Sequence, residues 1–270
     1  MKSNHYSYDR GDGVVLFLDG KHTAAFCHFL MGADTFGDAR SASFVAYLYE
    51  FGLGISQSYE KAYEYFFSCM DDDQGEAAYN LAILRFFGLG AAQSYYHSLE
   101  FMEKSAEMGC IEAQLYLAGA YLSGYLNTPS VFAVTTLPFH KALYEPPFPL
   151  LTGNCALADE NERFTVLIPS ESDAMRMLTL AAKHEEEYAG RFLGDAKFLL
   201  AQAHFEGFAF EGTDEDGSQI DREKGERLLF EAATQNNSRE ATAYILSHKN
   251  EFMLSELRKY ALLEEEKQKN

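Results

Sequence analysis

Histidine and cysteine are the side chains here that most often hold metals or act as nucleophiles, and their spacing argues against both uses. The eight histidines include no HxxxH or HExxH pair, so no two imidazoles share a helix face as a zinc hydrolase requires. The four cysteines lie far apart and include no CxxC pair, the spacing of a zinc knuckle or a thioredoxin motif. We predict buried free thiols in a reducing compartment, no metal site and no cofactor.

His140 and Cys155, with carboxylates nearby in the sequence, are a combination that could form a nucleophilic set. The surrounding GNCAL carries no nucleophile motif, and chance proximity is the simpler explanation. No GxxxxGK[ST] or GxGxxG loop opens a helix after a strand, so nucleotide binding is not indicated. We predict no catalytic residues, and keep as the alternative a hydrolase-like enzyme with a site between residues 127–170 and the helical part of the chain.

The acidic stretch 211–225 raises the possibility of a calcium loop. If Glu223 were the last ligand of a twelve-residue loop, Gly212 would stand where the first carboxylate is needed. A solvated acidic loop is the better interpretation.

Overall charge restricts the classes of partner. The 270 residues include 22 basic and 41 acidic side chains, a net charge of −19, while 47% of them are hydrophobic and can form a core. Nucleic acid and anionic membrane surfaces are poor partners, because affinity for both depends on basic charge. Basic protein segments fit better. The first apolar run, Val14 to Leu18, is too short for a signal peptide or a membrane span, so we predict a cytoplasmic protein.

A pattern repeated at a fixed interval organises the chain. Residues 42–54 read ASFVAYLYEFGLG, and residues 78–90, which begin 36 positions later, read AYNLAILRFFGLG. Two further copies place Ala118 and Ala201 at the same position of the pattern. A period of this length is typical of stacked helical repeats.

Each unit of the pattern predicts two helices. In the first unit, Ala46 and Tyr49 lie three apart on one face of a helix that ends at Gly52. A second helix is expected from Tyr59 to Met70, before the next unit begins.

The third unit is interrupted. The second helix of this unit is expected 40 residues late, at Ala174 to Ala182. The insertion, 127–170, holds all six prolines, which block helix interiors. The stretches 131–137 and 164–168 could pair as a small hairpin. The EPPFP motif could be a ligand for an aromatic groove, or part of a lid, or disordered.

With these motifs in hand, the chain resembles the Sel1-like repeat family, a relative of the tetratricopeptide repeats. The resemblance rests on the GLG sequences at 52–54 and 88–90, on Lys61–Ala62, and on Ala46 with Tyr49. It implies a right-handed α-solenoid with a concave face, used as an adaptor or scaffold.

Three features depart from the family pattern. The third unit has Gly124–Tyr125–Leu126 in place of GxG. Arg85 and His204 replace the tyrosine in the second and fourth units, and Gly225 replaces the alanine that opens the second helix.

The predicted fold class is all-α, a right-handed α-solenoid of about four Sel1-like helix-turn-helix repeats with one irregular insertion. We divide the chain into an N-terminal extension at 1–20, in which GDGVV is expected to be a loop or a short extended piece, and a region at 21–126 with a leading half repeat followed by Sel1-like repeats. The insertion at 127–170, further repeats at 171–248 and a capping helix with a polar tail at 249–270 follow.

A partner-binding stripe is predicted one position beyond the repeated alanine and tyrosine, where side chains turn by about 100°, and it is extended by the residue four positions before the first of each such pair. It consists of Tyr47, Glu50, Tyr79, Ile83, Phe86, Leu115, Leu122, Phe198 and Phe205. The stripe is partly aromatic, and aromatic side chains are common interface anchors. The sequence leaves equally open that these residues pack against neighbouring helices as core.

We therefore predict a non-enzymatic scaffold that binds a protein or peptide through its concave face and the insertion. A third hypothesis is an assembly component that stacks through its ends, which exposure of Phe252, Leu254 and Leu257 would favour.

Overall fold

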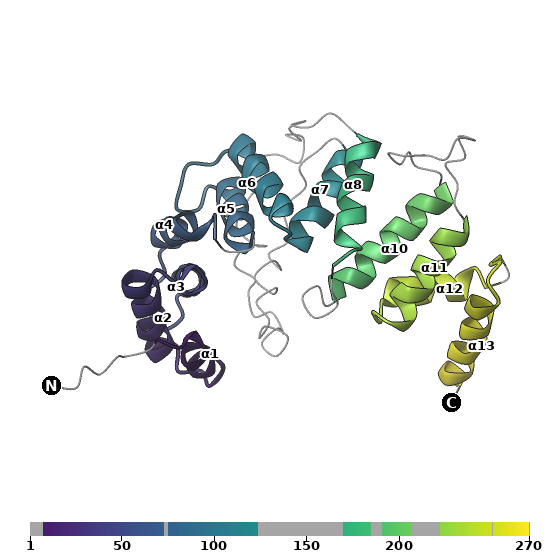
Figure 1. The fold of residues 1–270 in the computed structure, drawn as a ribbon, viewed down its shortest axis with the longest axis horizontal. Coiled ribbons are helices and arrows are strands. Elements are labelled where there is room, and N and C mark those ends of the chain that lie inside the picture. Colours follow the sequence, from purple (N-terminus) through teal and green to yellow (C-terminus); the bar gives the residue numbers. More distant parts are fainter. Residues whose placement is uncertain are drawn as a thin grey trace. The chain divides into compact units, whose positions relative to one another are not determined.

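The structure is a computed structural model, and it describes residues 8–72, 75–123, 170–184, 191–206, 222–249 and 251–269. Within these residues the chain forms twelve α-helices and no strand (Figure 1). The described residues divide into two compact units: unit 1 ends at Cys110 and unit 2 begins at Ile111. The predicted hairpin and most of the predicted insertion lie outside the described residues.

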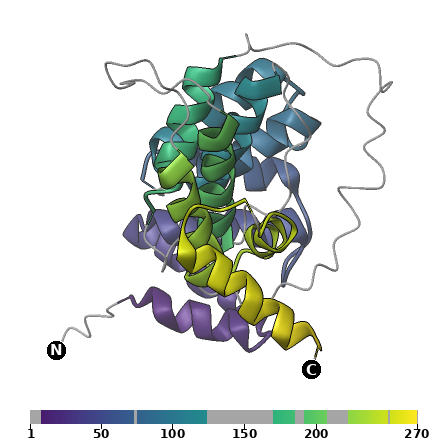
Figure 2. The same cartoon turned by 90° about the vertical axis from the view of Figure 1, so that its right-hand side faces the viewer.

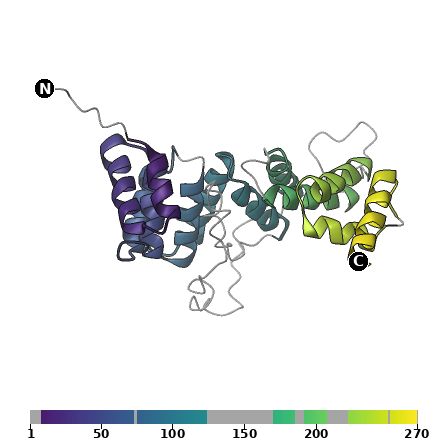
Figure 3. The same cartoon turned by 90° about the horizontal axis from the view of Figure 1, so that it is seen from below.

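Unit 1 consists of three pairs of helices in which successive helices pack on one another (Figure 3). They are α1 (Arg10–Leu18) with α2 (His22–Phe36), α3 (Ala39–Phe51) with α4 (Tyr59–Cys69), and α5 (Glu76–Phe87) with α6 (Tyr95–Glu107).

Unit 2 repeats this arrangement with less regular spacing along the chain. Its last helices, coloured yellow-green to yellow, face the viewer in Figure 2. Its helices are α7 (Ile111–Ser123), α8 (Glu171–Ala181), α10 (Arg191–Glu206), α11 (Arg222–Thr234), α12 (Arg239–Ser247) and α13 (Ser255–Lys269). The pairs are α7 with α8, α10 with α11, and α12 with α13.

Serine begins the second helix of three pairs, for a local reason. The hydroxyls of Ser58, Ser94 and Ser170 each accept a hydrogen bond from the backbone N–H three residues later, at 3.2–3.3 Å. A side-chain acceptor at this position satisfies an N–H that has no partner inside the helix. The three serines therefore mark the same point of the repeat.

A backbone hydrogen bond joins the two helices of each of these pairs. In the first two, the serine N–H donates to the carbonyl of Tyr49 and of Arg85, at 3.0 and 2.9 Å. In the third, Ser170 donates to the carbonyl of Tyr121 at 2.9 Å. The prediction that α7 pairs with a helix displaced along the sequence is confirmed, since the same bond closes the pair across residues 124–169.

The GxG motif has two distinct physical roles. Gly88 ends α5 with φ 71°, and its N–H donates to the carbonyl of Leu84. Gly90, with φ 70°, lies so close to the preceding helix pair that an added Cβ would stand 2.2 Å from the carbonyl oxygen of Tyr59. Gly54 approaches the backbone of its preceding pair equally closely, with a corresponding distance of 2.4 Å. The second glycine therefore permits backbone contact between successive pairs.

The repeated alanines form the centre of the stack. Ala46, Ala82, Ala118 and Ala201 are all buried. Because their side chains are single methyl groups, neighbouring helices can approach closely at these positions.

The expectation of a loop or short extended piece at GDGVV, residues 11–15, was wrong, because these residues lie within α1. Asp9 caps this helix by accepting from the N–H of Gly11 at 2.8 Å, and Phe17 is buried. Gly13 lowers helix propensity, but an added Cβ there would lie 2.6 Å from the Phe29 ring. Packing against α2 therefore outweighs the unfavourable local propensity.

Exposure of Phe252, Leu254 and Leu257 would favour stacking through the last helix, and two of these three residues are buried. Phe252 and Leu257 are buried within unit 2, and Leu254 is partly buried. The helix begins at Ser255, within the segment 249–270 for which a capping helix was predicted.

Replacing Gly90 by alanine should destabilise unit 1 more than replacing Gly37. Both residues have positive φ, 70° and 66°, so both variants pay for a left-handed backbone, about 1 kcal/mol. Only Gly90→Ala adds a clash, worth roughly 1–3 kcal/mol, since nothing lies within 4 Å of a Cβ on Gly37. Urea unfolding followed by circular dichroism measures both, and an equal loss in the two variants would contradict the role assigned to Gly90.

Candidate functional site

The predicted stripe is interior wherever it passes through unit 1. Its five members there, Tyr47, Glu50, Tyr79, Ile83 and Phe86, are each no more than 4% exposed. The sequence allowed either partner binding or core packing for this stripe, and in unit 1 its residues pack as core.

Two of these residues show how the packing arises. The ring of Tyr47 lies 4.6 Å from that of Phe51 and 6.0 Å from that of Phe17, centroid to centroid. The ring of Phe86 meets that of Tyr95 edge-on at 5.0 Å. Such aromatic contacts fill space both within a helix pair and between neighbouring pairs, and they leave little of the stripe in contact with water.

Glu50 is the exception among these apolar neighbours. It is 3% exposed, and its Oε2 has no hydrogen-bond partner in the part of the chain that the structure describes. Burial raises the pKa of the Glu50 carboxyl from 4.5 to about 8. The group is therefore mainly protonated at neutral pH, and neutral Glu50 occupies the position that Phe86 has in the next unit.

A glutamine bridge fixes the end of the helix that carries each of these side chains. Gln57 Nε2 donates to the carbonyl of Glu50 at 2.8 Å and to the hydroxyl of Tyr59 at 3.1 Å. Gln93 makes the same two bonds in the next unit, to Phe86 at 2.8 Å and to Tyr95 at 3.0 Å. The QSY sequence common to both units thus ties the first helix of a pair to the second, a role that sequence reasoning missed.

In unit 2 the stripe reaches a half-buried aromatic cluster, defined here as Phe198, Phe205, Tyr244 and His248. The Tyr244 ring lies 5.9 Å from Phe198, 6.1 Å from Phe205 and 4.1 Å from His248, centroid to centroid. Helices α10 and α12 therefore bring two predicted residues together with two residues that were not predicted.

The local sequence explains how Phe205 reaches this position. Phe198 and Phe205 lie seven residues apart, about two turns, so both project from one side of α10. The Phe205 ring also rests on Gly225 of α11, where an added Cβ would stand 2.6 Å from its edge. The glycine that departs from the family pattern thus makes room for this ring.

The remaining members of the stripe are less informative. Leu115 is partly buried against Ile111, Ala181, Leu193 and Ala196. The side chain of Leu122 lies outside the described residues. The structure therefore groups only Phe198 and Phe205 at a surface that is partly accessible.

Tyr244 could have been found from the sequence. Ala241 and Tyr244 are three residues apart, as are Ala46 and Tyr49, so α12 carries the alanine and tyrosine of a further repeat. The GxG motif is missing after Tyr244, and this absence hid the match.

Reactive chemistry finds little support in the described part of the chain. No group of three or more histidine, cysteine, aspartate or glutamate side chains there is arranged to hold a metal ion. His140 and Cys155, the basis of the alternative enzyme hypothesis, lie outside the described residues. Among the helices that are described, none combines the length and apolarity needed to cross a membrane.

Stacked helix pairs joined at recurring serines and glycines define an all-α protein of the solenoid repeat class. Comparison with known families makes this more specific. Residues 39–67, 75–110 and 194–237 match the family model described as Sel1 repeat. Three segments of the chain therefore match Sel1 repeats, and both the predicted resemblance and the predicted fold class are confirmed.

Two solved structures are similar to the chain. A Sel1 repeat protein from Oxalobacter formigenes has a TM-score of 0.57 and 17% identity, over 83% of this chain and 48% of that one. The protein c5321, described as a protective antigen of uropathogenic Escherichia coli with an SLR fold, has a TM-score of 0.39 and 19% identity, over 96% and 56% of the two chains. This chain thus spans about half the length of either structure, and at such identity the first one supports the fold alone. No curated protein matches the chain.

Replacing Glu50 by glutamine should change how stability depends on pH. In the unfolded chain the carboxyl has a pKa of 4.5, and in the folded chain about 8, so folding takes up a proton between these values. Stability of the natural chain should therefore fall as pH rises from 4.5 to 8. Glu50→Gln should be more stable than the natural chain at pH 8 by more than about 1 kcal/mol, and similar to it below pH 4.5.

Urea unfolding at a series of pH values measures this difference. The exposed substitution Glu100→Gln is the matched control and should follow the natural chain throughout. A constant offset between Glu50→Gln and the natural chain from pH 4 to pH 9 would contradict the protonated state of Glu50.

Proposed function

We propose that this chain is a non-enzymatic scaffold that binds a protein or peptide partner. Sel1 repeats generally serve as protein–protein interaction scaffolds. The observation that carries the proposal for this chain is the half-buried aromatic cluster of Phe198, Phe205, Tyr244 and His248.

The cluster has the properties of an interface anchor. Aromatic side chains offer a large contact area, and they lose little conformational entropy on binding because they have few rotatable bonds. The equivalent position in unit 1, Phe86, is fully enclosed, whereas Phe205 keeps part of its ring accessible. This difference favours unit 2 as the place where the stripe meets a partner.

The charge of the chain indicates the kind of partner. A net charge of −19 favours encounter with basic segments over acidic ones. We therefore propose a peptide that presents an apolar or aromatic side chain next to lysine or arginine. Contact through a concave face and through residues 127–170 is part of the same proposal and rests on the sequence.

A cytoplasmic location also belongs to this proposal. Cys69 and Cys110 are buried and Cys27 is exposed, and none of these three cysteines takes part in a disulfide. Free thiols suit a compartment that keeps cysteine reduced.

Selection from a random peptide library on the full chain tests the proposal. Selected peptides should be rich in lysine or arginine beside an apolar residue. Their affinity should fall at least roughly tenfold in Tyr244→Ala, a typical cost of removing an aromatic anchor, and should persist in Tyr244→Phe, which keeps the ring.

A matched tyrosine in unit 1 provides the control. Tyr96 is 69% exposed on α6, so Tyr96→Ala makes the same chemical change away from the cluster and should not alter binding. Circular dichroism confirms that each variant is folded. Absence of any enriched peptide, or equal affinity of the selected peptides for folded Tyr244→Ala and Tyr96→Ala, would overturn the proposal.

A further inference from the structure

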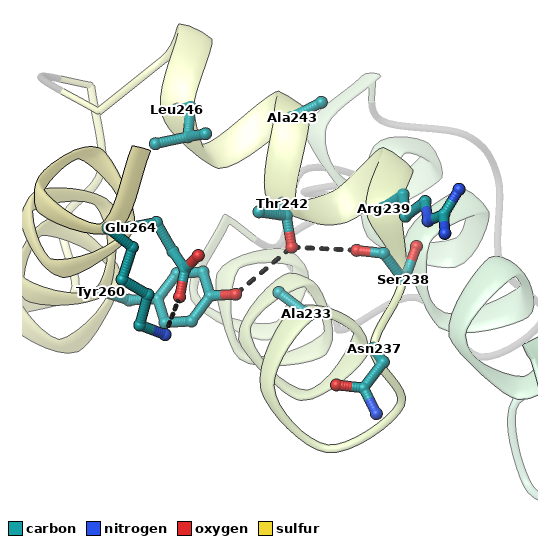
Figure 4. Close-up of a pocket in the computed structure, with 10 residues that line it drawn as sticks. Ala233, Asn237, Ser238, Arg239, Thr242, Ala243, Leu246, Tyr260 and Glu264 are labelled. Carbon is teal, nitrogen blue, oxygen red and sulfur yellow. Dashed lines mark hydrogen bonds and ion pairs between the residues drawn. The ribbon is translucent and has the colours of Figure 1, made fainter. Parts of the chain in front are cut away.

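A cavity of about 450 Å³ lies in unit 2 where α12 meets α13 and the end of α11 (Figure 4). Its volume is within the range of sites that bind small ligands or short peptide segments. Successive helix positions differ by about 100°, so Thr242 and Leu246 line the cavity while Tyr244, between them, faces the aromatic cluster on another side of α12. The cavity is therefore distinct from the surface discussed above.

The two ends of the cavity differ in chemistry. Figure 4 shows Arg239 and Asn237 at one end and Leu246 at the other. Arg239 is exposed, and its guanidinium makes no ion pair or hydrogen bond with any residue that the structure describes. Beside it, Asn237 has φ 51°, and no other non-glycine residue of the described chain has a positive φ.

Between the ends stand two hydroxyl groups. Thr242 donates to the carbonyl of Ser238 at 3.0 Å, so its oxygen accepts from the Tyr260 hydroxyl at 3.3 Å. Both hydroxyl protons are then in use, and the remaining lone pairs can only accept. A ligand that crosses the middle of the cavity must therefore bring N–H donors.

The charges at the cavity favour an acid over a base. Glu264 is already paired with Lys267, whose Nζ lies 2.6 Å from the carboxylate oxygen. Arg239 is thus left as the uncompensated charge in the lining, within a chain whose net charge is −19. Guanidinium groups bind carboxylates through two parallel hydrogen bonds, which makes a carboxylate the natural partner of this arginine.

The length of the site sets the size of the ligand. Arg239 and Leu246 are seven residues apart on α12, about 10 Å at the helical rise of roughly 1.5 Å per residue. An extended peptide covers about 10 Å with roughly three residues. In such a peptide the carboxylate matches the arginine and the apolar group matches the leucine. The N–H donors between them match the two hydroxyls.

We propose that this cavity binds an extended acidic peptide segment, with an aspartate or glutamate side chain on Arg239, an apolar side chain on Leu246, and backbone N–H groups that donate to the Thr242 and Tyr260 oxygens. This is a second binding site, with a ligand preference opposite in charge to that of the aromatic cluster, and it does not depend on the function proposed above.

Fluorescence anisotropy with labelled synthetic peptides tests the proposal on the full chain. The probe has Glu-Gly-Leu between Gly-Ser flanks and an amidated C-terminus, and the matched peptide has Gln-Gly-Leu. The glutamate peptide should bind roughly tenfold more tightly, the effect of one charge-assisted contact. Arg239→Gln should abolish that preference, and Leu246→Ala should weaken both peptides.

Two controls and one further peptide make the outcome decisive. Arg176→Gln, a matched change on α8, and Tyr96→Ala on α6 should both leave binding unchanged. A peptide ending in Gly-Gly-Leu with a free carboxylate separates the sources of the acid: preference for it over the glutamate probe would overturn the side-chain assignment. No binding of the glutamate peptide at millimolar concentration, or equal binding by Arg239→Gln, would overturn the site itself.

Discussion

Backbone contact between successive helix pairs is the constraint on which the repeat depends. At Gly90 the chain passes so close to the start of α4 that no side chain fits between them. Because the contact is backbone against backbone, it leaves little freedom for one pair to shift relative to the next. The buried alanines, the serine caps and the glutamine bridges then act within a spacing that the glycine has already set.

Within that spacing, one position has been used in different ways. Glu50, Phe86 and Phe205 all follow the repeat's tyrosine position, yet the first is a buried acid, the second a buried ring and the third a partly accessible ring. The helix that follows decides the outcome in the third case, since Gly225 provides the space that Phe205 occupies. A repeat can thus keep its backbone and still vary the chemistry that it presents.

Much of the fold followed from the sequence, because the 36-residue period and the GxG motif are local patterns. The displaced helix α8 was found in the same way. What could not be predicted depends on contacts between distant residues. Helix α1 forms despite its glycines because Phe29 packs against it, and the enclosure of Tyr47 requires Phe17 and Phe51.

The candidate sites also differ in whether local sequence patterns or contacts between distant residues define them. Phe198 and Phe205 were identified by their register, whereas Tyr244 was missed although the Ala241 spacing marks it. The cavity beside α13 has no sequence signature, because its lining comes from three helices whose register is set by packing alone.

The long separation between α7 and α8 has a consequence for how the protein is made. The bond from Ser170 to Tyr121 closes a loop of 49 residues, against nine for the bond from Ser58 to Tyr49. In the unfolded chain the longer loop costs about 1.5 kcal/mol more entropy to close. At a synthesis rate of roughly 5–20 residues per second, α7 leaves the ribosome a few seconds before its partner exists. Unit 1 can complete all of its pairs in that interval. The apolar face of α7 stays uncovered until α8 has been synthesised, and chaperones can bind it during that time.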